Sequence, residues 1–297
     1  MAKRIALTCF TCLLGLILPL NISAHGEDLV LIWETPAVFK QPESVIHDRK
    51  RDILYVSNVN GPADEKNGQG YLSKVAMDGE IIELEWVTSL NAPKGLALHE
   101  DTLYVSDVDA LVEIDIAKAK IINRYEASDA VFLNDVTVDH HGNVYVSDMM
   151  TDTIYRLSDN TFEVWLISPQ LESPNGLHAE QDRLVVAAWG VRTQGFDTKV
   201  PGHLKVVAYK DKSISSLGNG MPVGNLDGVE SDRDGDYYVT DWVAGKLYHI
   251  KPTGEAEVLL TLAKGAADHE YIGERDLIII PMMLNDKIVA YRAHDSD

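Results

Sequence analysis

Oxygen-bearing side chains recur in short polar motifs along the sequence. Glu43 lies in Pro-Glu-Ser, Asn134 in Leu-Asn-Asp, Asn175 in Pro-Asn-Gly and Asp227 in Leu-Asp-Gly, and Lys94 takes the corresponding place in Pro-Lys-Gly. Carboxylate and amide oxygens without sulfur or imidazole suit a hard divalent cation. If these motifs meet in space, they predict a cation site, with Ca²⁺ as the first choice and Mg²⁺, Mn²⁺ or Zn²⁺ behind it.

An alternative to the metal site is that the same motifs are simply turns. Asn-Gly and Asp-Gly pairs are common in turns, which would account for Asn175 and Asp227. It explains Asn134 only weakly and leaves Glu43, which has no turn preference, unexplained.

A repeated pattern of short strands supplies the elements that must position these motifs. β-Branched and aromatic residues dominate six segments. The segments are residues 54–57, 103–106, 144–147, 184–187, 237–240 and 277–280. Their second residues lie 49, 41, 40, 53 and 40 positions apart, and two further strand-like runs fit into each interval. Four-stranded repeats of about 40 to 50 residues predict an all-β fold, a six-bladed β-propeller.

The last unit of the repeat is one strand short. Residues 29–33, before the first unit, form the only spare strand, and we expect them to complete the last blade and so remove an open sheet edge. In such a ring the loops that enter the innermost strands meet at one mouth of the central channel, which gathers the five polar motifs. The sixth equivalent position is Ala267 or Asp268, because that unit is one residue shorter.

Two long loops, residues 58–70 and 188–202, are expected to roof that mouth from opposite sides of the ring. Four side chains in or beside the second loop would offer apolar and cationic contacts to a ligand. They are Trp189, Arg192, Phe196 and Trp242. The alternative is that both are ordinary surface loops.

Histidines and an acidic run form weaker candidates. His269 follows the sixth mouth position, where it would serve as a base or as a buried structural residue. Residues 232–236 are acidic but lack the spacing of an EF-hand, so we expect a hairpin turn there. His140 and His141 are expected in solvent. The sequence contains no nucleophile elbow, phosphate loop or zinc ligand set.

An export signal is predicted at the N-terminus. Lys3 and Arg4 precede an apolar run over residues 5–20, and a small-residue stretch then ends at Ala24. The run is shorter than the roughly 20 residues of a usual membrane span. We therefore expect residues 1–24 to be a cleaved signal peptide and residues 25–297 to form one propeller domain, periplasmic or secreted.

Charge narrows the range of partners. The chain has 46 acidic and 26 basic residues, a formal net charge of −20, and no Lys/Arg-rich block. Such a surface repels nucleic acid and anionic lipid headgroups. The expected partner is a small-molecule substrate or ligand, with no nucleic acid and, after signal cleavage, no membrane.

At Glu43, Asn134, Asn175 and Asp227 the sequence resembles the regucalcin/gluconolactonase family, also called the senescence-marker-protein family, of six-bladed propellers. The likeness covers most of the chain after the signal segment. It implies one divalent cation held by Glu43, Asn175 and Asp227, with Asn134 beside the metal and the substrate. It also implies hydrolysis of a lactone, in which Asp227 helps to activate water or relay a proton.

Phe132 departs from the pattern of the sugar-lactone members, and Lys94 also bears on the choice of substrate. Those members commonly carry an arginine at the position of Phe132, and Lys94 brings a cation to the mouth, where it would weaken metal binding or hold an anionic substrate group. Both are expected to contact the substrate, a small lactone or ester more apolar than a sugar lactone. The alternatives are a non-catalytic propeller that binds a ligand or protein, and a metal that is purely structural.

Overall fold

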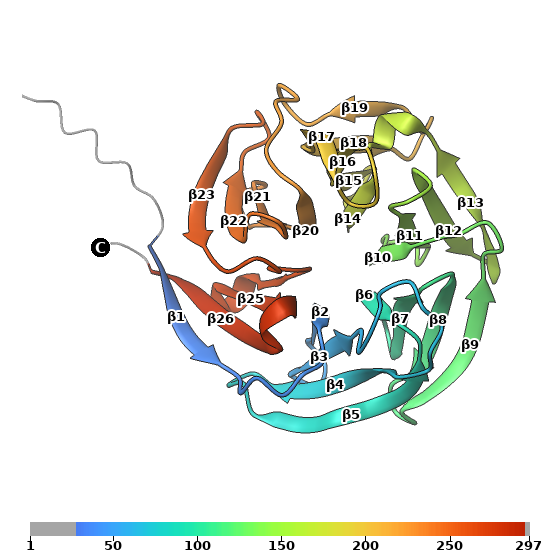
Figure 1. Ribbon diagram of the computed structural model, residues 1–297, viewed down its shortest axis with the longest axis vertical. Coiled ribbons are helices and arrows are strands. Elements are labelled where there is room, and N and C mark those ends of the chain that lie inside the picture. The colour runs from blue at the N-terminus through green and yellow to red at the C-terminus, as the bar shows by residue number, and fades with distance from the viewer. Residues whose placement is uncertain (1–27, 295–297) are drawn as a thin grey trace, which may run out of the picture.

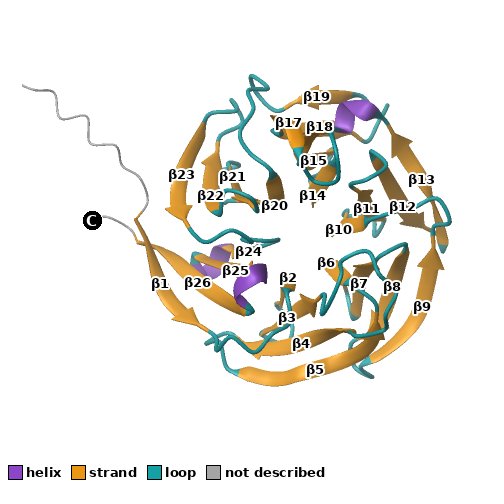
Figure 2. Ribbon diagram, viewed as in Figure 1, coloured by secondary structure: helices purple, strands orange, loops and turns teal. Residues whose placement is uncertain are grey.

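The computed structural model describes residues 28–294, which form six four-stranded antiparallel sheets around a central axis (Figure 1). This is the predicted all-β, six-bladed β-propeller. Short 3₁₀ turns, η1 (Pro169–Leu171), η2 (Gly273–Arg275) and η3 (Met283–Asn285), lie in connections between strands (Figure 2). Within residues 28–294 no helix has the length and apolarity needed to cross a membrane. The predicted signal peptide lies outside the described residues.

The first three blades each consist of four strands that follow one another in the chain, from the channel outward. Blade 1 contains β2 (Pro42–Asp48), β3 (Ile53–Asn58), β4 (Gly70–Ala76) and β5 (Ile81–Leu90). Blade 2 contains β6 (Pro93–His99), β7 (Thr102–Asp107), β8 (Ala110–Asp115) and β9 (Lys120–Glu126). Blade 3 contains β10 (Leu133–Val138), β11 (Val144–Asp148), β12 (Thr153–Ser158) and β13 (Thr161–Ile167).

The other three blades vary this plan. Blade 4 contains β14 (Pro174–Ala179), β15 (Arg183–Ala188), β18 (Leu204–Ala208) and β19 (Ile214–Ser216), and a separate hairpin of β16 (Gly190–Arg192) and β17 (Thr198–Pro201) interrupts it. Blade 5 contains β20 (Leu226–Ser231), β21 (Tyr237–Asp241), β22 (Lys246–Ile250) and β23 (Ala256–Thr261). Blade 6 contains β24 (Glu270–Ile272), β25 (Leu277–Met282), β26 (Lys287–His294) and β1 (Asp28–Glu34).

Blade 6 joins the two ends of the described chain. Strand β1 pairs antiparallel with β26 as the outermost strand of that sheet, so the blade is built from both ends (Figure 1). The segment just before its innermost strand touches blade 1, where the Asp268 backbone N–H donates to the Glu43 carbonyl oxygen at 3.0 Å. These contacts close the ring at the mouth.

Apolar side chains fill the spaces between neighbouring blades. Between blades 1 and 2, Tyr55 stacks on Trp86 with ring centroids 4.6 Å apart, and both pack with Leu96 and Leu103. Each sheet is thus apolar on both faces, which explains why the repeating strands contain so many β-branched and aromatic residues.

The inner strands of the first five blades share a bulge. The register with the second strand of the blade shifts after the first residue of the inner strand, for instance between Pro42 and Val45 and between Leu226 and Val229. The same shift occurs in β6, β10 and β14. Each bulge contains a polar motif such as Glu43-Ser44 or Asp227-Gly228. A bulge frees residues from the ladder and turns their side chains, which brings these motifs into the channel.

Candidate functional site

A cavity of about 710 Å³ lies at the mouth where the inner strands begin. We call it the mouth cavity. Its lining includes all five polar motif residues predicted from the sequence, one from each of five blades: Glu43, Lys94, Asn134, Asn175 and Asp227. The condition on which the predicted cation site depends, that these residues meet in space, is therefore met.

Hydroxyl groups on the second strands fix the backbone of these motifs. The Ser147 hydroxyl accepts the Asp135 backbone N–H at 3.0 Å and donates to the Asn175 carbonyl at 2.7 Å in the next blade. Thr240 likewise donates to the Ala267 carbonyl at 2.9 Å. Ala267 is therefore the sixth mouth equivalent and offers no side-chain ligand, while Asp268 occupies the next position.

The glycines after Asn175 and Asp227 lie on strands and not in turns, so the turn interpretation does not hold. A Cβ atom on Gly176 would lie 2.0 Å from the Asp227 carbonyl oxygen, and one on Gly228 would lie 2.6 Å from Asp268 Oδ1. Glycine is needed at these positions because the adjacent inner strands approach each other too closely for any side chain.

The carboxylates at the base of the mouth cavity are buried. Burial, and then the nearby negative charges of Asp227 and Asp268, raise the pKa of Glu43 well above its usual value. Burial, followed by Asp268, likewise raises the pKa of Asp227. Glu43 is only 6% exposed, and its Oε2 atom has no hydrogen-bond partner within residues 28–294. An orphaned buried carboxylate oxygen fits a cation ligand.

Two amides complete the polar base. Asn134 donates from Nδ2 to Asn175 Oδ1, and Asn175 donates from its own Nδ2 to the Leu226 carbonyl at 3.0 Å. This chain of bonds holds both amide groups beside the carboxylates. Glu43, Asn175 and Asp227 therefore fit a divalent cation by the chemistry of their donors, and Asn134 lies next to Asn175.

Lys94 brings a buried positive charge to the same cavity. Its ammonium donates to the Ala92 carbonyl at 3.0 Å and lies 4.4 Å from the centre of the Phe132 ring. Burial lowers the pKa of Lys94 to about 8, although Glu43 opposes the shift. Lys94 and Phe132 both line the cavity, where each was expected.

An aromatic roof covers the mouth cavity on the side of blades 4 and 5. Trp189 lies between Phe196 and Trp242, with ring centroids 6.1 and 6.3 Å away, and donates from Nε1 to the Phe196 carbonyl at 2.9 Å. All three residues line the cavity, and Ala63 of the opposite long loop lines it too. Both long loops therefore contribute to the site.

The side chain of Arg192, predicted to contact a ligand, binds protein groups outside the mouth cavity. Arg192 does not line the mouth cavity; its guanidinium donates to Ser173 Oγ at 2.8 Å, to the Gly195 carbonyl at 3.0 Å and to the Met150 carbonyl at 2.8 Å. Hydrogen bonds to its own loop and to two neighbouring segments occupy this side chain. Arg192 thus positions the loop that carries Phe196.

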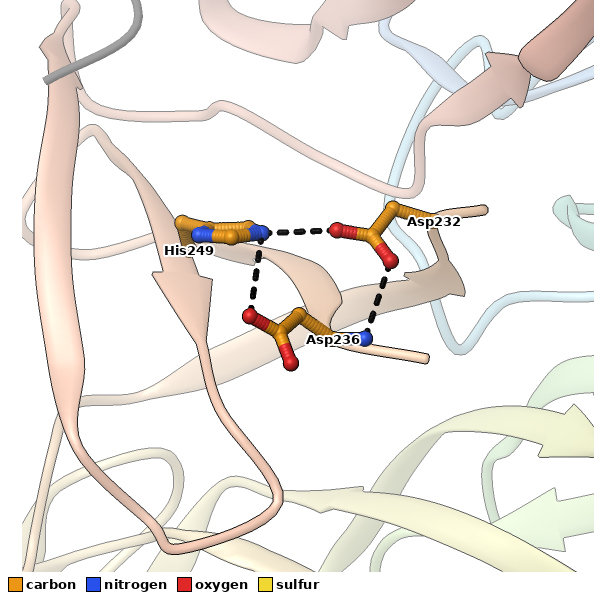
Figure 3. Close-up of side chains that lie close together, drawn as sticks. All are labelled: Asp232, Asp236 and His249. Atoms are coloured by element: carbon orange, nitrogen blue, oxygen red, sulfur yellow. Dashed lines mark hydrogen bonds and ion pairs between the residues drawn. The ribbon is translucent and has the colours of Figure 1, made fainter. Parts of the chain in front are cut away.

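The weaker candidates lie away from the mouth. His269 is buried deeper in the channel and does not line the mouth cavity. Residues 232–236 connect β20 to β21, as the hairpin interpretation expected. There His249 Nε2 lies 2.8 Å from Asp232 and 3.8 Å from Asp236, and Asp232 accepts the Asp236 backbone N–H (Figure 3). These contacts stabilise the hairpin.

Several lining residues carry no recognisable signal in the sequence. Met149 and Met283 provide apolar walls, Asn225 lies beside Asp227, and the ammonium of Lys264 lies 5.0 Å from the Trp242 ring centre. They come from loops whose lengths and conformations differ between blades. A repeat pattern therefore does not reveal them.

The fold and the cavity together define a propeller that collects polar groups from several blades at one mouth of its channel. The model of the SMP-30/gluconolactonase/LRE-like region matches residues 85–264, more than half of the sequence. The chain belongs to this family, which confirms the resemblance seen in the sequence. No curated protein sequence matches the chain significantly.

Solved structures share the fold at low sequence identity. A gluconolactonase from Xanthomonas campestris has a TM-score of 0.68 at 13% identity, covering 91% of this chain and 92% of its own. A streptogramin B lyase has a TM-score of 0.63 at 11% identity, covering 90% and 97%. A virginiamycin B lyase from Staphylococcus aureus has a TM-score of 0.61 at 15% identity, covering 89% and 99%.

Proposed function

We propose that this protein is an exported, divalent-metal-dependent hydrolase of a small lactone or ester that is more apolar than a sugar lactone. One observation carries the proposal: the buried Oε2 of Glu43, which has no hydrogen-bond partner among the described residues, lies in one cavity with Asn175 and Asp227. These three residues would hold the ion, with Ca²⁺ as the first choice.

A bound divalent cation would polarise the substrate carbonyl and stabilise the negative charge that develops on its oxygen. The Asp227 carboxylate would accept the proton of the water that bonds to the carbonyl carbon, and would return it to the alkoxide oxygen released when the acyl C–O bond breaks, a role favoured by its raised pKa. The Asn134 amide, held beside Asn175, would orient the substrate carbonyl. The aromatic roof would exclude bulk water from the reacting bond.

The lining favours an apolar substrate. Phe132, Met149 and Trp189 form a buried cluster at one wall of the mouth cavity. A sugar lactone presents several hydroxyl groups, which this wall would leave without partners. The Lys94 ammonium remains available to an anionic group of the substrate.

Histidine-dependent lyase chemistry is the less suitable assignment. A histidine-to-alanine variant of the virginiamycin B lyase from Staphylococcus aureus is described as catalytically inactive. Among the described residues that line the mouth cavity there is no histidine. The acids and amides here suit carboxylate-assisted hydrolysis better.

A coupled metal titration and hydrolysis screen tests the proposal. Purified protein is stripped with a chelator, titrated with Ca²⁺, and assayed against aliphatic and aromatic lactones and esters. Glu43→Gln and Asp227→Ala should each reduce Ca²⁺ binding and lower kcat/KM by about 10²-fold or more. Glu163→Gln, an exposed change on β13, serves as the matched control. Metal binding and turnover that survive both active-site variants would place the activity elsewhere.

The same screen also tests the alternative that the protein binds a ligand without catalysing a reaction. The volume of about 710 Å³ and the aromatic roof also suit a propeller that only holds its ligand. Such a protein would show ligand-induced thermal shifts without chelator-sensitive turnover. A purely structural metal would instead lower the melting temperature on chelation without changing ligand binding.

Export forms a separate part of the proposal. It rests on the three-part pattern of residues 1–24 in the sequence. Mass spectrometry of the protein recovered from the periplasm or medium of an expressing bacterium should give a chain that begins at His25. A full-length chain confined to the cell interior would contradict it.

A further inference from the structure

A second cavity, of about 370 Å³, occupies the channel beyond the mouth motifs. We call it the channel cavity. None of its lining residues lines the mouth cavity. One of them is Arg49, which follows the end of β2 and has a side chain that is 71% exposed. The channel cavity therefore opens on the face of the ring opposite the mouth.

A serine, a histidine and a glutamate lie in hydrogen-bonding order beside this cavity. His178 on β14 places Nδ1 3.2 Å from Glu230 Oε2 and Nε2 3.0 Å from the Ser231 hydroxyl oxygen. A carboxylate only accepts hydrogen bonds, so Nδ1 carries the proton of the neutral ring and Nε2 accepts the Ser231 hydroxyl. Serine hydrolases use the same three kinds of group in the same order, through the same two ring nitrogens.

The three residues lie at the open end of the channel cavity. His178 and Glu230 line it, and Ser231 follows Glu230 at the end of β20, where it is partly exposed. Val138 and Ala179, which occupy the position of Ser231 in blades 3 and 4, line the cavity too. An ester that enters from this face would thus meet the serine and its base together.

The surroundings of His178 suit a general base. Burial alone would lower the pKa of His178, but the charge of Glu230 and its hydrogen bond outweigh burial and raise that pKa above its usual value. An imidazole held by a carboxylate accepts the proton of a serine hydroxyl more readily and stays in one orientation.

His269 supplies a hydrogen-bond donor in the same cavity. It lines the channel cavity and is 1% exposed, yet neither ring nitrogen has a hydrogen-bond partner in the part of the chain that the structure describes. Burial lowers the pKa of His269 to about 4, so the ring is neutral and one nitrogen carries an N–H without an acceptor. Such a donor fits an oxygen that becomes negative during acyl transfer.

We propose that Ser231, His178 and Glu230 form a second, metal-independent esterase site, on the face of the ring opposite the mouth. It goes beyond the proposed function and does not depend on it. The cavity volume limits the acyl part of the substrate to a short chain. Three further carboxylates line the cavity and would repel an anionic ester, so the substrate is neutral or cationic. They belong to Asp135, Asp268 and Glu270.

The reaction needs no oxidant, reductant or ion. Ser231 Oγ bonds to the ester carbonyl carbon while its proton passes to His178 Nε2. The acyl C–O bond then breaks, and His178 returns that proton to the oxygen of the leaving alcohol. Water attacks the acylated serine in the same way: His178 takes a proton from the water and returns it to Ser231 Oγ as the free acid departs.

Another serine–histidine contact provides a matched control. Ser216 Oγ lies 2.9 Å from His203 Nε2 on blade 4. Burial, and then the charge of Lys205, lower the pKa of His203. The carboxylate that acts on His203 belongs to Glu172, which is paired with Lys205 at 2.9 Å. Ser216 thus has a histidine neighbour but not an imidazole held by a carboxylate.

Covalent labelling tests the proposal. Purified protein in excess chelator is incubated with a neutral fluorophosphonate, digested, and examined by mass spectrometry. Ser231 should be phosphonylated with loss of fluoride, and Ser216 should stay unmodified. His178→Gln should slow the labelling of Ser231 by about a hundredfold, and Glu230→Gln by about tenfold. Because Glu230→Gln lowers the pKa of His178, it should also move the half-maximal labelling rate to lower pH, an effect that a purely structural role would not produce.

Ester hydrolysis in chelator separates this site from the mouth cavity. Turnover of p-nitrophenyl acetate should persist without metal and fall about tenfold or more in Ser231→Ala, but not in Ser216→Ala. The anionic mono-p-nitrophenyl succinate should react more slowly than the acetate. Turnover that stops in chelator would overturn the proposal and leave the mouth site intact. Absence of label on Ser231, or equal labelling of Ser216, would overturn it whatever the mouth cavity does.

Discussion

Lys94 places its ammonium 4.4 Å from the centre of the Phe132 ring, in the same cavity as the Glu43 carboxylate. A buried cation therefore lies where a divalent ion is proposed to bind, and the two positive charges repel each other. The aromatic ring and the Ala92 carbonyl stabilise the ammonium in place of bulk water.

Replacing Lys94 should strengthen metal binding. Lys94→Met keeps the length of the side chain and removes its charge, so the Ca²⁺ affinity of the mouth site should rise about tenfold, or about 1.4 kcal/mol. Calorimetric titration measures this directly. Lys264→Met, which removes the ammonium over Trp242 in the same cavity, should change the affinity by less than twofold. A weaker affinity in Lys94→Met would show that Lys94 supports the site and does not oppose the ion.

Glu43→Gln should stabilise the metal-free protein. The pKa of Glu43 is raised in the fold above the unfolded value of about 4.3, so the folded state binds the proton more tightly. Stability is therefore lost as the pH rises from that value through the raised one. With chelator at pH 8, Glu43→Gln should melt about 2–4 °C higher than the wild type, the shift that about 1 kcal/mol gives in a chain of this size.

This stability difference has a clear pH signature. The advantage of Glu43→Gln should shrink towards zero as the pH falls to about 4, where the wild-type carboxyl is protonated in both states. Thermal unfolding across pH 4–8 measures it. The exposed control Glu163→Gln should show no such trend. A melting-temperature difference between Glu43→Gln and the wild type that does not change with pH would argue against burial of an ionised carboxylate.

Gly176→Ala should weaken the ring itself. The new methyl group would lie 2.0 Å from the Asp227 carbonyl oxygen, which is backbone and cannot rotate away. The expected loss in unfolding free energy is roughly 1–3 kcal/mol, measured by chemical denaturation. Gly273→Ala meets nothing closer than 3.5 Å and should change stability by less than about 0.5 kcal/mol. Equal effects of both substitutions would contradict the close approach of β14 and β20.

Arg192→Met should loosen the roof of the mouth cavity. It removes hydrogen bonds to Ser173, Gly195 and Met150 that hold residues 188–202 in place. We expect faster proteolytic cleavage within residues 193–199 and a higher KM, with little change in the melting temperature because the bonds lie in a surface loop. Arg156→Met on blade 3 is the matched control. Unchanged proteolysis would mean that Trp189 and the β16–β17 hairpin suffice to hold the loop.

Most of the architecture was predictable because each blade repeats one simple pattern. Strands such as β3 and β7 contain apolar, β-branched and aromatic residues at similar spacing, and a ring of six such units gathers Glu43 and Asp227 at one mouth. The repeat pattern was therefore enough to predict both the fold and the position of the motif residues.

Other features depend on contacts that no local pattern encodes. Arg192 was expected at a ligand and instead bonds its own loop and two neighbouring segments, because the hairpin of β16 and β17 directs it there. Asp268 was named only as a possible mouth residue and Asp135 only as part of the Leu-Asn-Asp motif, yet both line the channel and not the mouth cavity. Their shared surroundings become apparent only when six distant segments are placed side by side.

The pairing of β1 with β26 has a consequence for biosynthesis. Strand β1 is synthesised long before its partner β26, so blade 6 forms only after residues 287–294 have left the ribosome. Until then the nascent chain has a strand with unpaired backbone groups, open to wrong partners. Truncation within residues 287–294 would leave β1 in that condition permanently.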